Sequence, residues 1–111
     1  METTMKKSVV QSFSAIPRIE GMESSDVIFV TAMGLICGKP VAPEDREKPN
    51  DAGMIALNVA CETFGETTPI GNDGFIALKD VTIISQNGTK FSFNTLTVFY
   101  DQIIAVSAGK I

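Results

Sequence analysis

The sequence contains no histidine and no tryptophan, and its only cysteines are Cys37 and Cys61. Without histidine the chain has no imidazole base and no histidine metal ligand, and two cysteines alone cannot build a structural zinc site. No glycine-rich phosphate loop with its lysine follows a predicted strand. These absences argue against the common catalytic and metal-binding classes, so we expect a protein that is not an enzyme and that needs no cofactor or metal.

Long hydrophobic runs are also missing. No apolar stretch approaches the ~20 residues that a membrane helix needs, so we expect no contact with a membrane. The N-terminal segment is too thin in apolar residues for a signal peptide, so the cysteines are interpreted as reduced core residues and the expected location is the cytoplasm. Hydrophobic residues make up 44% of the 111 residues, which is enough to form a hydrophobic core. A chain of this length is expected to form one domain, spanning residues 1–111.

The net charge of −4 is distributed unevenly along the chain. Residues 42–74 contain seven acidic and two basic residues, whereas the remainder contains six acidic and seven basic ones. Neither part has the basic stripe that is typical of nucleic-acid-binding domains. The acidic segment instead favours contact with a basic protein surface.

The clearest structural pattern is a long hairpin over residues 74–106. Asn87-Gly88 separates two alternating apolar runs, and this pair predicts a tight turn in which both residues have positive φ. The alternation slips by one residue midway along each strand, for example between Leu78 and Val81. Such a slip exchanges the two faces, so it predicts bulges or sharp bends, which a sheet needs in order to close into a small barrel.

A second hairpin is predicted over residues 26–41, with Gly34 at its turn and Gly38 at a bend or a close backbone approach. A short last strand is predicted over residues 103–106. The N-terminal residues 5–13 fit either a short helix or an edge strand, in an arm that packs on the barrel. The expected fold class is therefore mainly β, a small, strongly bent, five-stranded antiparallel barrel.

An acidic insertion over residues 42–74 is predicted between the second and third strands. Residues 42–50 are interpreted as a solvated loop, and a helix over Ala52–Phe64 follows, with Asn50 or Asp51 as its cap. Four apolar residues share one face of this helix, namely Met54, Leu57, Cys61 and Phe64. Two further apolar residues, Ile55 and Val59, widen the apolar arc, so we expect this helix to contact more than its own barrel.

Three stretches resemble the Sm-like family, which includes the bacterial Hfq proteins. Residues 27–41 resemble the first Sm hairpin, Leu78-Lys79-Asp80-Val81 resembles the end of the third strand, and residues 97–107 resemble the junction of the fourth and fifth strands. The chain also resembles small phage-associated Sm-like proteins of undefined role. The resemblance implies a homo-oligomeric ring of roughly five to seven subunits, in which the fourth strand of one subunit pairs with the fifth strand of the next.

The same resemblance implies single-stranded RNA as a ligand. Asn72 and Asp73 stand near the position of the family's first RNA-binding loop, Tyr100 is placed to stack on a base, and Gln102 to hydrogen-bond one. The chain departs from the family because the acidic insertion replaces the first loop, and Asp101 adds negative charge to the second loop, where RNA binding normally recruits positive charge. The alternative interpretation makes Tyr100 a barrel-rim residue beside an ordinary turn.

The strands at residues 95–100 and 103–106 have no lysine, proline or inward charge to protect an edge, which is typical of segments that pair with other chains. The expected oligomer interface consists of Leu96, Val98, Phe99, Ile103, Ile104 and Val106. The alternative is that the N-terminal arm covers the edge and that the protein is a monomer or dimer.

Three hypotheses for function follow, in order of preference. The first is a non-enzymatic ring that acts as a structural or protein-interaction scaffold, and the second is an RNA-binding Sm-like ring. The third is a small enzyme, which rests on scattered carboxylates such as Asp73, Asp80 and Asp101 as ligands for a divalent cation. Aspartates at loops and strand ends are far more often turn or cap residues.

Overall fold

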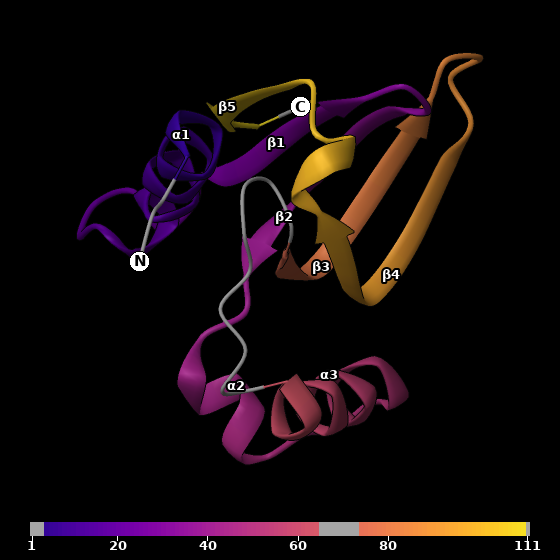
Figure 1. Ribbon diagram of the computed structural model, residues 1–111. Coiled ribbons are helices and arrows are strands. Elements are labelled where there is room, and N and C mark those ends of the chain that lie inside the picture. The colour runs from indigo at the N-terminus through magenta and orange to yellow at the C-terminus, as the bar shows by residue number, and fades with distance from the viewer. Residues whose placement is uncertain (1–3, 65–73, 111) are drawn as a thin grey trace.

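A computed structural model describes residues 4–64 and 74–110 of the chain. Five strands form one antiparallel sheet in the order β4-β3-β2-β1-β5 (Figure 1). The strands are β1 (Asp26–Thr31), β2 (Gly34–Pro40), β3 (Phe75–Ser85), β4 (Lys90–Phe99) and β5 (Ala105–Gly109). The helices are α1 (Met5–Ser14), α2 (Pro43–Glu47) and α3 (Ala52–Phe64), with short 3₁₀ turns η1 (Ile16–Arg18) and η2 (Tyr100–Gln102).

The predicted first hairpin is confirmed as β1 and β2, and both of its glycines have the expected roles. Gly34 follows the turn with φ +138, and a Cβ there would collide with the backbone of Ile84 on β3. A Cβ at Gly38 would lie 3.1 Å from the carbonyl oxygen of Lys79, so this glycine permits the close approach of β2 to β3.

The predicted bend in the long hairpin is also confirmed. The β2–β3 register shifts between Cys37↔Thr82 and Lys39↔Lys79, so that Asp80 and Val81 of β3 stand opposite the single residue Gly38 of β2. Between β3 and β4 the register is unchanged, and Asp80 and Asn94 are both left out of the pairing. Among the described residues, Asp80 is the one non-glycine residue with positive φ, at 53°. Figure 1 shows β4 turning back sharply on itself. The slip in the alternation therefore marks a real bend that keeps the apolar residues on the inner face.

The turn of this hairpin differs from its prediction. Gly88 has φ +86, but Asn87 is not in the positive-φ region, so the expected two-residue turn with two left-handed residues is wrong. The loop is longer, because the Ser85 N–H donates to the Thr89 carbonyl. The Asn87 side chain accepts hydrogen bonds from the Ser85 hydroxyl and the Thr89 N–H, and this Asx-type bonding stabilises the loop in place of a left-handed Asn.

The expected closure into a barrel is wrong, because β4 and β5 are the two edges of an open sheet. The core still lies inside its curve and includes Val27, Phe29, Leu78, Val81, Val98 and Ile103. Val10 of α1 is 2% exposed within this same cluster. Helix α1 thus covers core residues beside β5. Because the helix already buries this apolar surface, the sheet does not have to close into a barrel in order to bury it.

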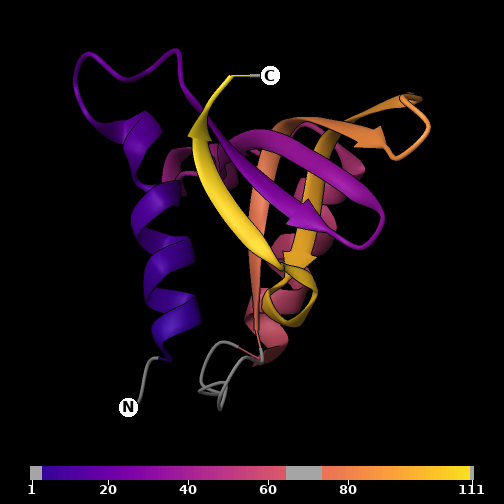
Figure 2. The same ribbon diagram turned by 90° about the horizontal axis from the view of Figure 1, so that it is seen from above.

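The N-terminal segment is a helix, which decides between the two predicted alternatives. The Thr4 side chain accepts a hydrogen bond from the Lys7 N–H and caps the helix. Figure 2 shows α1 beside β5, and α3 behind β3 and β4.

The predicted helix between the second and third strands is confirmed as α3. Asp51 is its cap, since its carboxylate accepts a hydrogen bond from the Met54 N–H at 2.7 Å. Of the predicted stripe, Met54 and Leu57 are buried and Cys61 is half-buried, while the Phe64 side chain lies outside the described residues. The predicted solvated loop is wrong in part, because residues 43–47 form α2, which begins with a proline and whose Asp45 carboxylate accepts from the Ala42 N–H.

Candidate functional site

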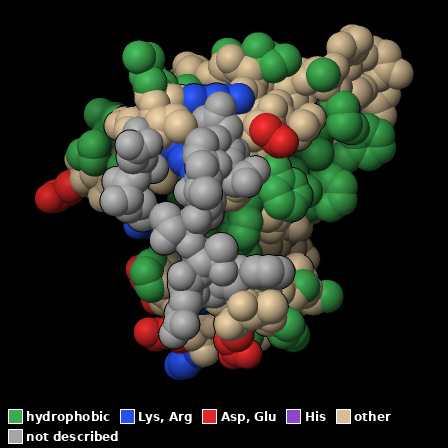
Figure 3. Space-filling model, viewed as in Figure 1, with side chains coloured by type: hydrophobic (Ala, Val, Ile, Leu, Met, Phe, Trp, Pro, Cys, Tyr) green, Lys and Arg blue, Asp and Glu red, His purple; other side chains and the backbone are tan. Residues whose placement is uncertain are grey.

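The first candidate surface is the outer edge of β4. This strand is ten residues long and pairs with β3 alone among the described strands. Beyond Lys90 at its start, the strand has no charged residue and no proline. An edge of this kind presents unpaired N–H and carbonyl groups with nothing to discourage another strand. In Figure 3, hydrophobic side chains gather on this side of the molecule.

The opposite edge is β5, which is five residues long and, among the described strands, pairs with β1 alone. A hollow of about 510 Å³ separates α1 from the chain at residues 103–106, and Met5 and Val9 line its helical side. Because α1 is a helix that packs through Val10 on the core, it does not supply a strand partner for β5. No described strand therefore pairs with β5 on its outer side, where α1 lies beside it (Figure 2).

The six predicted interface residues fall into two groups. Four of them lie in or against the core: Val98 and Ile103 are buried, and Leu96 and Val106 pack on them. The other two are exposed, Phe99 at 57% and Ile104 at 70%. Of the six residues, Phe99 and Ile104 are therefore the ones whose side chains are mostly exposed, whereas the other four belong to the core or pack against it.

An apolar opening lies beside the β4 edge. A hollow of about 260 Å³ is lined by the β1–β2 turn, by β3 and by the second half of β4. Phe91 and Phe93 share the inner face of the sheet with Val81, yet they are 50% and 44% exposed. The exposure of these two residues was not predicted from the sequence.

The aromatic ring of Phe99 is held in place by a neighbour. Its centroid lies 6.2 Å from that of Phe75, in an edge-to-face arrangement with an interplanar angle of 75°. Such pairs contribute about 1 kcal/mol beyond the area that they bury. Phe99 is therefore both exposed and oriented, which suits a contact residue.

The predicted RNA-binding residues do not form one described cluster. Asn72 and Asp73 lie outside the described residues. Tyr100 is 6% exposed, its hydroxyl accepts a hydrogen bond from Gln11, and the Lys7 ammonium lies 5.6 Å from its ring centroid. Its ring is thus packed in the protein and is not presented as a platform for a base.

Gln102 is exposed and lines the apolar opening beside Phe99. The residues that fix Tyr100, namely Lys7 and Gln11, were not singled out in the sequence. Their spacing of four residues on one helix face was the signal that could have found them.

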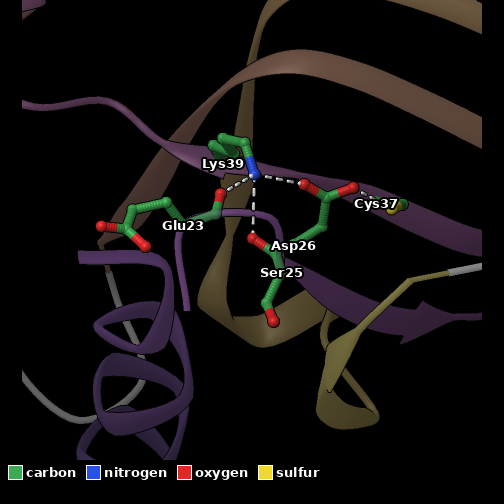
Figure 4. A network of polar contacts seen from close by, with 5 residues as sticks. All are labelled: Glu23, Ser25, Asp26, Cys37 and Lys39. Atoms are coloured by element: carbon green, nitrogen blue, oxygen red, sulfur yellow. Dashed lines mark hydrogen bonds and ion pairs between the residues drawn. The ribbon is translucent and has the colours of Figure 1, made fainter. Parts of the chain in front are cut away.

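A polar network joins the start of β1 to β2 (Figure 4). The Lys39 ammonium donates to the Asp26 carboxylate at 2.8 Å and to the backbone carbonyls of Glu23 and Ser25. The Cys37 thiol donates to the other Asp26 oxygen at 3.2 Å. Burial raises the pKa of Asp26, but the hydrogen bonds from Lys39 and Cys37 outweigh it, so the pKa lies below 3.8.

The same network makes Cys37 an unreactive thiol. Burial, followed by the hydrogen bond to Asp26 and its negative charge, raises the pKa of Cys37 to about 11. Because the thiolate is the reactive form, Cys37 is a structural residue and not a nucleophile. This agrees with the sequence-based interpretation of this cysteine as a reduced core residue, since both cysteines are free.

The acidic segment is tied to the sheet by one ion pair. Asp45 of α2 accepts from the Lys79 ammonium at 2.8 and 3.0 Å, and this hydrogen bond, with that from the Ala42 amide, lowers the pKa of Asp45. Figure 3 shows acidic side chains over α2 and α3. Asp80 and Asp101 are exposed, and within residues 4–64 and 74–110 no group of three or more acidic or cysteine side chains is arranged to hold a metal ion.

Comparison with known proteins adds no family. No protein-family model matches the chain, and no curated protein or solved structure is detectably similar to it. None of the helices in the described part of the chain combines the length and apolarity needed to cross a membrane. The function is therefore inferred from the arrangement of the described residues.

Proposed function

We propose that this chain is an Sm-like subunit that assembles into a closed homo-oligomeric ring and acts as a non-enzymatic structural or protein-interaction scaffold. The observation that carries the proposal is the strand order, with β4 and β5 as the two edge strands of one curved sheet that is not closed. The β4 edge of one subunit pairs with the β5 edge of the next. Because the two edges differ, the contact is head-to-tail, and such contacts give a ring when the rotation closes.

Side chains at the two edges support this pairing. Phe99 stands exposed at the end of β4, beside an apolar opening, and Ile104 stands exposed just before β5. In a head-to-tail contact, Ile104 beside the β5 edge of one subunit faces the apolar opening beside the β4 edge of the next, and both surfaces are apolar. Burying both would remove from water two of the larger exposed apolar side chains in the described part of the chain.

The partners follow from the same surfaces. The first partner of each subunit is another copy of the same chain. The acidic face over α2 and α3 favours a basic protein surface as a further partner of the ring. A cytoplasmic location belongs to this proposal. The runner-up is a ring that binds single-stranded RNA, which the exposed Gln102 at the opening favours and the buried Tyr100 weakens.

Light scattering on the purified protein tests the ring. We expect a mass of several chains at micromolar concentration, and we expect Ile104→Glu and Phe99→Glu each to shift it toward one chain. Met22→Glu is the matched control, because Met22 is 47% exposed in the loop before β1 and belongs to neither edge strand. A wild-type mass of one or two chains would rule out the ring.

A second measurement separates the scaffold from the RNA-binding ring. A fluorescent oligo-U or oligo-A strand is titrated with the protein at low salt. Binding that is micromolar or tighter and weakens as salt is added would favour RNA binding, because phosphate contacts release counterions. Absence of binding by an intact ring would favour the scaffold.

A further inference from the structure

A hollow of about 290 Å³ opens at the end of the sheet where β2 stops and β3 begins, between α1 and α3. Its polar wall comes from four different elements: Gln11 from α1, Arg18 from η1, Arg46 from α2 and Cys61 from α3. Phe75, at the start of β3, adds an aromatic ring. The hollow is thus assembled by the tertiary fold from segments that are far apart in the sequence.

The charge of this hollow is opposite to that of the protein. The chain has two arginines, Arg18 and Arg46, and both line it, whereas none of its described lining residues is a lysine, aspartate or glutamate. The chain as a whole has 13 acidic residues and a net charge of −4. We propose that this hollow, which we call the arginine pocket, binds a small organic oxyanion.

Neither arginine is neutralised by a carboxylate within the described part of the chain. The Arg18 guanidinium donates to the carbonyl oxygen of Val41 at 3.1 Å, and Arg46 Nε donates to the side-chain oxygen of Asn58 at 2.9 Å. Both acceptors are uncharged, and the two ion pairs among the described residues involve lysines. A guanidinium has five N–H donors, so each arginine has donors left for a ligand.

One acidic residue that interacts electrostatically with Arg18 is already engaged by a lysine. This residue is Asp45, and both of its carboxylate oxygens accept from the Lys79 ammonium. Asp45 is not among the lining residues of the arginine pocket. Among the described residues, an incoming oxyanion therefore does not have to displace a carboxylate from either guanidinium.

The side chains of the pocket are held before any ligand arrives. Arg46 and Asn58 exchange two hydrogen bonds, because the Asn58 amide also donates to the Arg46 carbonyl at 3.0 Å. Gln11 is fixed by the Tyr100 hydroxyl, and Arg18 by the backbone of Val41. Pre-organisation of this kind lowers the entropy that binding must overcome.

The remaining wall defines the rest of the ligand. It is apolar and is formed by Pro40, Leu57, Phe75, Ile76 and Ala77 among others. A planar guanidinium fork matches a phosphate or carboxylate group, and an apolar wall favours a ring or short hydrocarbon attached to it. The ligand class is therefore a phosphate monoester or carboxylate with an apolar body. Because the pocket lies within one chain, this proposal does not rest on ring assembly.

Isothermal titration with three probes of similar size tests the pocket. Phenyl phosphate and benzoate carry the two candidate oxyanions, and benzyl alcohol is the neutral analogue. We expect saturable binding of at least one of the two anions and at least tenfold weaker binding of the alcohol. The stronger anion identifies the class. Equal affinity for the alcohol, or no saturable binding of either anion, would overturn the proposal.

Charge-removing variants assign the binding to the two arginines. We expect Arg18→Gln and Arg46→Gln each to weaken the stronger probe at least tenfold. Lys90→Gln and Lys48→Gln are the matched controls, since each removes one positive charge from an exposed lysine outside the pocket and should change the affinity less than twofold. If Arg46→Gln does not fold, Arg18→Gln decides, because the Arg18 residue is exposed. Equal weakening by the control variants would overturn the assignment.

Discussion

Asp51 joins α3 to β4. One carboxylate accepts the Met54 N–H at 2.7 Å as the helix cap and accepts the Thr95 hydroxyl at 3.0 and 3.2 Å. The helix backbone is close at this point, since a Cβ added to Gly53 would lie 2.9 Å from Cβ of Thr95. A single side chain therefore starts the helix and fixes it to the bent part of the sheet.

Removing this connection should lower stability. We expect Asp51→Ala to decrease the free energy of unfolding by about 1–2 kcal/mol, because a cap and a hydrogen bond to β4 are lost together. Thr95→Val keeps the shape of the side chain and should cost about 1 kcal/mol. Urea unfolding followed by circular dichroism measures both. Glu62→Ala, at an exposed position near the end of α3, is the control and should change the value by less than about 0.5 kcal/mol.

Gly34 and Gly88 offer a matched pair of turn glycines. Both have positive φ, but a Cβ at Gly34 would collide with the Ile84 backbone, whereas a Cβ at Gly88 meets nothing within 4 Å. We expect Gly88→Ala to cost about 1 kcal/mol from backbone strain alone. Gly34→Ala should cost more than about 2 kcal/mol, because the β2–β3 pairing must also shift. Equal losses in urea unfolding would contradict the close approach of Gly34 to the β3 backbone.

The Lys39–Asp26 ion pair predicts a loss of stability in acid. The pKa of Asp26 is lower in the folded protein than its ordinary value of 3.8. Its contribution is therefore fully present above pH 3.8 and disappears as the pH falls through the lower folded value. In unfolding measured from about pH 2 to about pH 6, Asp26→Asn should show a shallower acid dependence than wild type. Asp101→Asn, at an exposed position, should retain the wild-type slope.

The two cysteines should react at different rates with a disulfide reagent. Cys37 is buried and its pKa is raised to about 11, whereas Cys61 is half-buried beside the arginine pocket. At about pH 8 we expect Cys61 in the Cys37→Ser variant to react at least about tenfold faster than Cys37 in the Cys61→Ser variant. Faster reaction of Cys37 in the folded protein would show that the network around Asp26 opens.

The segment containing α2 and α3 should be dispensable for the sheet. The main core cluster includes no described residue of α2 or α3, although Met54 and Leu57 are buried. We expect replacement of residues 42–73 by a short Gly/Ser turn to retain the strand signal in circular dichroism and a cooperative unfolding transition. Loss of all folded structure would show that this segment belongs to the folding core.

The sequence by itself determined the local structure of this protein. The Gly34 turn, the helix after Asp51 and the bend near Asp80 depend on φ preferences, capping and the two-residue period, and these are written in neighbouring residues. The Asn87-Gly88 pair is compatible with more than one turn, and the prediction of a two-residue turn was wrong. The longer loop forms because the Asn87 side chain accepts hydrogen bonds from Ser85 and Thr89.

Only the tertiary structure decided which surfaces remain open. Alternation places Val98 and Phe99 on opposite faces, but the open sheet leaves Phe99 exposed and unites Val98 with a core that Val10 of α1 also enters. In the same way, Arg18 and Arg46 belong to no sequence pattern and line one pocket only after α1, α2 and α3 pack around the end of the sheet. Which distant segments pack together depends on how much apolar surface the whole chain buries, and a pattern of neighbouring residues does not give that information.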